Sequence, residues 1–186
     1  MIIYFVDNCL NIINNSKVIN IKMKDIICQG NVVNRHLFVE EFNKEIKKAK
    51  IKSKLFGDKI WIVKNVFYNN RDLFYLENLF LELGFVKVDF INIRELLPDR
   101  DATFIEIDKD YMVMYVESGV FVDLKLVGDI PKVIRYFQED LKKDVVLFGT
   151  NEYLSQIKVA DLNIYYLENS ASYICQSLLK VKKYGV

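Results

Sequence analysis

The sequence contains few of the residue types on which many functional sites depend. It has a single histidine, His36, and three cysteines, Cys9, Cys28 and Cys175, none of which belongs to a CxxC pair. This sparse set excludes a zinc site built from cysteine and histidine. An odd number of scattered cysteines with mostly apolar neighbours instead predicts reduced core thiols, and therefore a cytoplasmic protein.

Glycine, proline and long apolar runs are also scarce. The seven glycines are spread thinly and form neither a P-loop nor a GxGxxG pattern. No apolar run approaches the roughly 20 residues that cross a bilayer. The opening "MIIYFV" is too short for a signal peptide and has no basic flank. We therefore expect membrane contact only through a partner, or weakly through a helix predicted at residues 170–183.

Charge of either sign is nearly balanced, with a formal net charge of +1. This balance gives no overall attraction to nucleic acid, so we expect no nucleic-acid partner. Residues 1–98 hold 15 Lys and Arg against 11 Asp and Glu, whereas residues 99–186 hold 11 against 14. The positive excess lies mainly in "KEIKKAKIKSK", residues 44–54, which we interpret as a solvated helix face. The alternative is a basic docking patch for an acidic partner or a lipid surface.

The chain is rich in hydrophobic residues, at 52%, so it predicts a packed globular protein. In the first half, apolar runs predict a three-stranded meander at residues 2–6, 10–14 and 18–29. A helix over 34–51 follows, with Asn34 as its cap and one apolar stripe: Leu37, Phe38, Phe42, Ile46 and Ala49. A strand at 59–67, a helix at 69–85 and a strand at 86–93 complete this half. Asn70 or Asp72 is the expected cap of the second helix, and Gly84 its expected end.

Pro98 and the charges after it predict a boundary, and the second half then repeats the order of the first. It has strands at 103–108, 111–116 and 120–127, a helix at 129–143 and a strand at 144–149. A short helix or loop at 151–160, an extended piece at 163–167 and a helix at 170–183 follow. We expect the last helix to pack on its own sheet, and the alternative is that it lies on a membrane surface.

The two halves also match each other residue by residue. A shift of 101 residues places Ile3 on Phe104, Val6 on Ile107, Asp7 on Asp108 and Ile12 on Val113, and after a one-residue gap it places Ile19 on Phe121. The match predicts an internal duplication, although meanders are common enough to produce such matches by coincidence.

Five segments resemble the actin-like ATPase superfamily, in a truncated and degenerate form of its FtsA and PilM type. They are "IIYFVDN", "LFYLENLFLELGFVKVDFINI", "FIEIDKDYMVMYVESGVF", "DVVLFGTNEYL" and "NSASYICQSLL". The resemblance implies an α/β fold of two tandem ribonuclease-H-like lobes, residues 1–98 and 99–186. Each lobe would be a mixed sheet with a three-stranded meander and crossover helices. It also implies ATP and Mg²⁺ as ligands, with Asp7 and Asp108 in the phosphate loops and Gly149 at the adenosine.

The departures from this pattern lie in the phosphate loops. The first loop is "DNCLN" and the second is "DKDYM", and neither contains the glycine that lets backbone amides approach a phosphate. In the second loop, bulky Tyr111 and negatively charged Asp110 oppose phosphate. We therefore expect no resident cofactor, with Asp7 and Asp108 ending strands and accepting hydrogen bonds from turn amides. The alternative is that these two carboxylates bind Mg²⁺ through water.

Two enzymatic alternatives find little support in the sequence. A nuclease related to ribonuclease H needs several carboxylates around its metals, but the strands after Asp7 carry Asn11, Asn20 and Lys22. A serine hydrolase would have to use His36, which has no nucleophile-elbow motif near it and which we expect at the surface.

The sequence therefore predicts a non-catalytic scaffold or adaptor in a cytosolic assembly, such as division, cell-shape, pilus or secretion machinery. It would bind a protein partner or further copies of itself. The alternative is an ATP-binding ATPase or switch.

Overall fold

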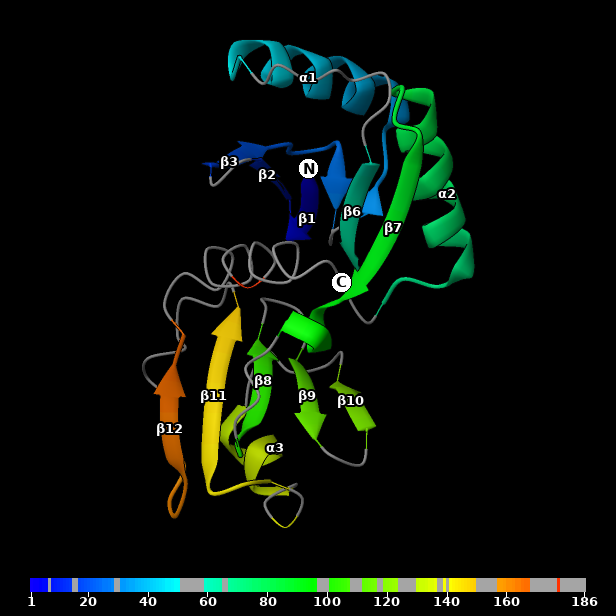
Figure 1. Cartoon of the computed structure of the whole chain (residues 1–186). Coiled ribbons are helices and arrows are strands. Elements are labelled where there is room, and N and C mark those ends of the chain that lie inside the picture. The colour runs from blue at the N-terminus through cyan, green and yellow to red at the C-terminus, as the bar shows by residue number, and fades with distance from the viewer. Residues whose placement is uncertain are drawn as a thin grey trace. The chain divides into compact units, whose positions relative to one another are not determined.

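The structure is a computed structural model, shown in Figure 1, of a mixed α/β protein. It describes residues 1–6, 8–14, 17–28, 31–50, 59–64, 67–96, 101–107, 112–116, 119–123, 130–136, 139, 141–149, 157–167 and 177. The described residues up to Leu96 form one compact unit, and those from Asp101 to Leu167 form another. Each unit contains a five-stranded sheet.

The first unit begins with the predicted meander, except that the third strand, predicted over residues 18–29, ends at Lys22. Strands β1 (Ile2–Val6), β2 (Cys9–Asn14) and β3 (Lys17–Lys22) pair in antiparallel fashion, and a small hairpin of β4 (Ile27–Cys28) and β5 (Asn31–Val32) follows. Strands β6 (Lys59–Lys64) and β7 (Lys87–Asn92) then add in parallel beyond β1. The sheet order is therefore β3-β2-β1-β6-β7.

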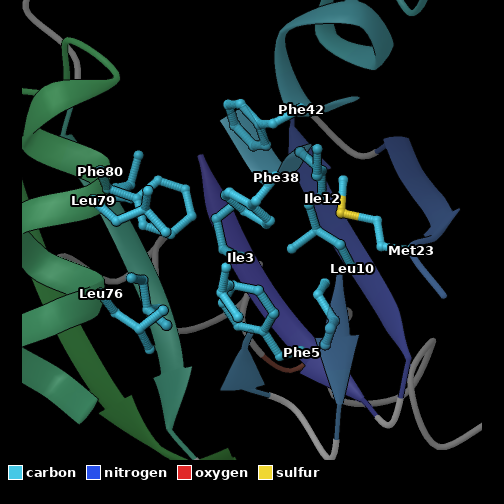
Figure 2. Close-up of a cluster of buried hydrophobic side chains, with 14 of the residues drawn as sticks. Ile3, Phe5, Leu10, Ile12, Met23, Phe38, Phe42, Leu76, Leu79 and Phe80 are labelled. Carbon is cyan, nitrogen blue, oxygen red and sulfur yellow. The ribbon is translucent and has the colours of Figure 1, made fainter. Parts of the chain in front are cut away.

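Two helices pack their apolar stripes into one core with this sheet. Helix α1 (Arg35–Lys48) contributes Phe38 and Phe42, and helix α2 (Asn70–Glu82) contributes Leu76, Leu79 and Phe80. Figure 2 shows these side chains beside Ile3, Phe5, Leu10 and Ile12 of the strands. The ring of Phe80 meets those of Phe38 and Phe42 edge-on, at centroid distances of 5.9 and 5.7 Å. Such aromatic pairs stabilise a core beyond the area they bury.

The cap of the first helix is confirmed, and its stripe is confirmed in part. The side-chain oxygen of Asn34 accepts a hydrogen bond from the amide of Leu37 at 3.2 Å. The side chains of Phe38, Phe42 and Ile46 are buried, as predicted, but Leu37 is 42% exposed. Leu37 lies beside the stripe because it is one position off the spacing of three and four residues that the buried side chains follow.

The second helix ends as predicted but begins at a different cap. The cap is Asn69, whose side-chain oxygen accepts a hydrogen bond from the Asp72 amide, while the Asp72 carboxylate accepts one from the Asn69 amide to complete a capping box. At the other end Gly84 has a φ of 95°, and the Phe85 amide donates to the Phe80 carbonyl at 3.2 Å. This hydrogen bond is that of a Schellman motif, in which glycine supplies the left-handed residue. A short 3-10 turn at Ile93–Leu96 then ends the unit.

The second unit has a sheet of the same strand order, β10-β9-β8-β11-β12. Its antiparallel strands are β8 (Thr103–Ile107), β9 (Met112–Val116) and β10 (Gly119–Asp123). Strands β11 (Asp144–Gly149) and β12 (Asn163–Tyr166) add in parallel, and α3 (Ile130–Tyr136) precedes β11. The helix predicted at 170–183 lies outside the described residues except for Ser177.

The antiparallel meanders of the two sheets, β1-β2-β3 and β8-β9-β10, match strand for strand at an offset of 102 residues. In the first sheet, Ile3 and Phe5 of β1 face the core with α1 and α2, and in the second sheet Ile105 and Ile107 of β8 face the core with α3. Because crossover connections of this kind are right-handed, the helices mark equivalent faces. The same offset takes Leu10 to Met112, Ile12 to Met114 and Ile19 to Phe121, with no gap.

The predicted shift of 101 residues is therefore wrong by one position. It places Ile3 on Phe104, whose side chain lies on the other face of its sheet because side chains alternate along a strand. With the offset of 102, Asp7 corresponds to Lys109 and no longer to Asp108. After this correction, Asp7 and Asp108 are no longer at equivalent positions in the overlay of the two halves.

Candidate functional site

The candidate site predicted from the sequence lies at the carboxyl ends of β8 and β11. These strands run parallel, and their register places Gly149 opposite Ile107. Asp108 follows Ile107 directly in the sequence, but Asp108 and Asp7 lie outside the described residues. Of the three predicted nucleotide ligands, the structure therefore describes Gly149 alone. The roles of Asp7 and Asp108 stay predictions.

Gly149 is required by its contact with the neighbouring strand. Its φ of 133° is one that other residues rarely adopt, and an added Cβ would meet the carbonyl oxygen of Ile107 and lie 2.8 Å from its carbonyl carbon. The space that a side chain would fill is thus occupied by protein backbone and is not left open for a ligand. This geometry gives glycine a structural role at position 149, and its predicted contact with adenosine stays a prediction.

A buried carboxyl group lies one residue before Ile107. Glu106 is 6% exposed, and its Oε2 accepts a hydrogen bond from the Tyr115 hydroxyl at 3.0 Å. The Tyr115 ring stacks on Phe148 of β11 at a centroid distance of 6.2 Å. A buried charged or polar group is stable only with such partners. Sequence reasoning did not single out Glu106, although an acidic residue inside the apolar run "TFIEI" was the available signal.

The first sheet also buries a polar group on the face away from its helices. Asn11 is 1% exposed, accepts a hydrogen bond from Asn20 at 2.9 Å and donates to the Tyr4 carbonyl at 3.4 Å. These asparagines stand where a nuclease would need carboxylates, and they bond to each other. Among the described residues, no group of three or more histidine, cysteine or acidic side chains is placed to hold a metal ion.

The basic segment at the end of α1 is partly neutralised within the helix. The Lys44 ammonium donates to Glu41 at 2.9 Å, and that of Lys48 donates to Glu45 at 3.1 Å. The hydrogen bond that Lys44 donates to Glu41 raises the pKa of Lys44. These exposed pairs favour a solvated helix face over a basic docking patch for this part of the segment, while residues 51–58 lie outside the described residues.

The histidine and two of the cysteines are described. His36 is exposed near the start of α1, as predicted for a surface residue. Cys9 is half-buried, but Cys28 is exposed, so the prediction that the thiols lie in the core is wrong for Cys28. Cys28 is exposed because it is the second residue of the two-residue strand β4, where alternation turns Ile27 inward.

Comparison with known proteins identifies the fold. No family model and no curated protein matches the sequence. Among solved structures, the crystal structure of ethanolamine utilization protein EutJ from Carboxydothermus hydrogenoformans, an actin-like protein, matches with a TM-score of 0.67 and 11% sequence identity. The match covers 95% of this chain and 88% of that one.

The chain has an actin-like fold. Because the match covers 95% of this chain, the likeness includes residues of both sheets. The actin-like fold that the sequence predicted is confirmed, and the FtsA and PilM type stays a prediction. In the part of the chain that the structure describes, no helix is both long and apolar enough to cross a bilayer.

Proposed function

We propose that this actin-like chain is a non-catalytic scaffold or adaptor that binds a protein partner in a cytoplasmic assembly. We further propose that it consists of two ribonuclease-H-like lobes, residues 1–98 and 99–186, and that it lies nearest the FtsA and PilM type. The identical strand order of the two sheets supports the two lobes. The sequence segments that resemble FtsA and PilM support the type, and the scattered cysteines, none in a CxxC pair, support a reducing compartment.

The geometry of Gly149 carries the proposal that the chain is not an ATPase. Both predicted phosphate loops lack glycine, so Gly149 is the one glycine of the family's nucleotide-binding pattern that this sequence retains. Its missing side chain makes room for the Ile107 carbonyl, which accounts for the glycine without a nucleotide. The proposal therefore includes no resident cofactor, no catalytic residue and no nucleic-acid partner.

Isothermal titration calorimetry with Mg-ATP tests this function. We expect no binding heat at micromolar to millimolar nucleotide for the full chain. Micromolar binding that is lost in Asp108→Ala and retained in Asp110→Ala would establish the alternative, an ATP-binding switch with Asp7, Asp108 and Gly149 at the nucleotide. Asp110 is the matched control because it is a carboxylate of the same predicted loop.

A further inference from the structure

Strand β12 is an outer strand of the second sheet, and Figure 1 shows it as the orange arrow beside β11. The amides of Asn163 and Leu167 donate to the carbonyls of Lys143 and Leu147, each at 2.9 Å. Because hydrogen-bonding direction alternates along a strand, the amides of the residues at alternate positions, Ile164 and Tyr166, point away from β11. No strand of the described part of the chain pairs with this side of β12.

The residues of β12 include neither a charged side chain nor a proline. Outer strands are commonly guarded by charged residues or proline. Each of the other outer strands of the two five-stranded sheets contains a charged residue: Lys17 and Lys22 in β3, Lys87 and Asp89 in β7, and Asp123 in β10. The four residues of β12 are "NIYY", and its tyrosines, Tyr165 and Tyr166, are 52% and 36% exposed. Tyrosine is enriched in protein interfaces.

A hollow of about 390 Å³ lies beside β12 on one face of the sheet. Its described lining is Asp101, Ala102, Asp144, Val146 and Tyr165. The side chain of Asp101 is 87% exposed, with the Lys142 ammonium at 3.3 Å, and Asp144 accepts a hydrogen bond from Asn163 at 2.7 Å. Among the described residues, two carboxylates against one lysine leave a negative surplus in the hollow, which suits a basic side chain.

We propose that β12 binds an extended segment of a partner protein by strand addition, with a lysine or arginine of that segment in the hollow. Strand addition combines main-chain hydrogen bonds for affinity with side-chain pockets for specificity, and the edge and hollow supply both. The inference rests on the proposed adaptor function, for which it names the binding site.

A second copy of the chain fits this edge less well than a peptide segment. Stable dimers bury about 1,200–2,000 Å² in total, and a strand of four residues supplies only a small part of such an interface. Two copies paired through β12 would also bring the carboxylates of both hollows close to the same interface, where their like charges would repel each other. The partner that we expect at β12 is therefore a short extended segment of another protein. Because it makes few contacts, we expect it to bind with micromolar affinity.

Selection from a random dodecapeptide phage library on the full chain tests the proposal. We expect enriched peptides to alternate β-branched or aromatic residues with lysine or arginine. Ile164→Pro removes an outward amide and is tolerated at a sheet edge, so it should weaken binding of a synthetic enriched peptide at least tenfold without unfolding the chain. Asp144→Asn should weaken the arginine-containing peptide more than its alanine analogue.

The matched pair of variants is Tyr165→Lys and Val18→Lys. Each adds a guarding lysine at an exposed position of an outer strand, since Val18 of β3 is 45% exposed, but only Tyr165→Lys lies on β12. We expect loss of binding in Tyr165→Lys alone. The proposal is overturned if no peptide is enriched, or if enriched peptides bind both variants and Ile164→Pro as they bind the original chain.

Sedimentation equilibrium tests whether a second copy of the chain occupies β12. Calorimetry distinguishes a failure of the proposed adaptor function from a failure of the proposed β12 site. A dimer that Ile164→Pro dissolves would assign β12 to a second copy and overturn the partner segment. Micromolar Mg-ATP binding would overturn the proposed function, whereas the peptide titrations report on β12 alone, so the two failures are distinguishable.

Discussion

At the residue scale, the contact of Gly149 with the Ile107 carbonyl predicts a large cost for any side chain at this position. In Gly149→Ala, the added Cβ meets backbone that cannot move without breaking the β8–β11 ladder. We expect a loss of about 3 kcal/mol in the free energy of unfolding, from combined backbone strain and overlap, measured by urea denaturation.

Gly84→Ala is the control for this prediction. Gly84 also has a positive φ, so its substitution carries the conformational penalty of about 1–2 kcal/mol for a left-handed residue. An equal loss in the two variants would show that the Ile107 contact contributes nothing to the requirement for glycine.

The sequence singled out Gly149 through a family motif, whereas its geometry gives a separate, structural reason for the glycine. A family motif marks a glycine without saying whether a ligand or a neighbouring strand fills the space beside it, because only the fold brings Ile107 there. Glu106, in contrast, is a buried charged residue that the sequence reasoning did not single out. Its burial depends on Tyr115 and Phe148 in neighbouring strands, and spacing along the chain does not reveal those partners.

At the element scale, an ion pair between Asp89 of β7 and Lys59 of β6 links these neighbouring strands. The hydrogen bond from Lys59, the charge of that lysine and the nearby Lys87, whose ammonium lies 3.5 Å from the carboxylate, lower the pKa of Asp89. A lowered folded-state pKa means that the pair stabilises the fold at neutral pH. That stability is lost as the pH falls from the unfolded-state pKa of about 3.9 through the folded-state pKa.

Asp89→Asn should therefore lower the denaturation midpoint at neutral pH and have little effect at the acidic end of the titration. The pair is partly exposed, so we expect a loss of no more than about 1 kcal/mol, measured by urea denaturation across pH. Asp101→Asn, which changes a carboxylate that is 87% exposed, is the control and should have less effect. A loss in Asp89→Asn that is the same at every pH would contradict an electrostatic origin.

Elements were more predictable than their register. Apolar spacing and turn residues predicted α1, α2 and the strands of both sheets, since periodicity is a local property of the chain. The offset between the halves was wrong by one residue because apolar residues occupy both faces of these strands. Ile2 and Ile3 are both buried, for example, so hydrophobicity alone does not say which of them faces the helices.

At the scale of the whole molecule, the sequence predicted the actin-like fold through the order of its elements. That order survived the error in offset, because strand order depends on which elements follow one another and not on the face that each residue takes. The partner and the role in an assembly depend on surfaces outside any motif, and the sequence alone did not draw attention to β12.

The division of the chain into two compact units predicts that a core change in one unit is felt mainly there. Trp61 is the only tryptophan and lies in β6 of the first unit, beneath the Lys59 ammonium at 3.9 Å, so its fluorescence reports on that unit. Phe80→Ala removes a ring from the buried cluster and should cost the first unit about 3–5 kcal/mol. We expect a large shift in the urea midpoint of tryptophan fluorescence and a smaller loss of hydrogen-exchange protection in the amides of β8 and β11. Equal losses by both probes would show that the two sheets unfold as one cooperative body and not as separate lobes.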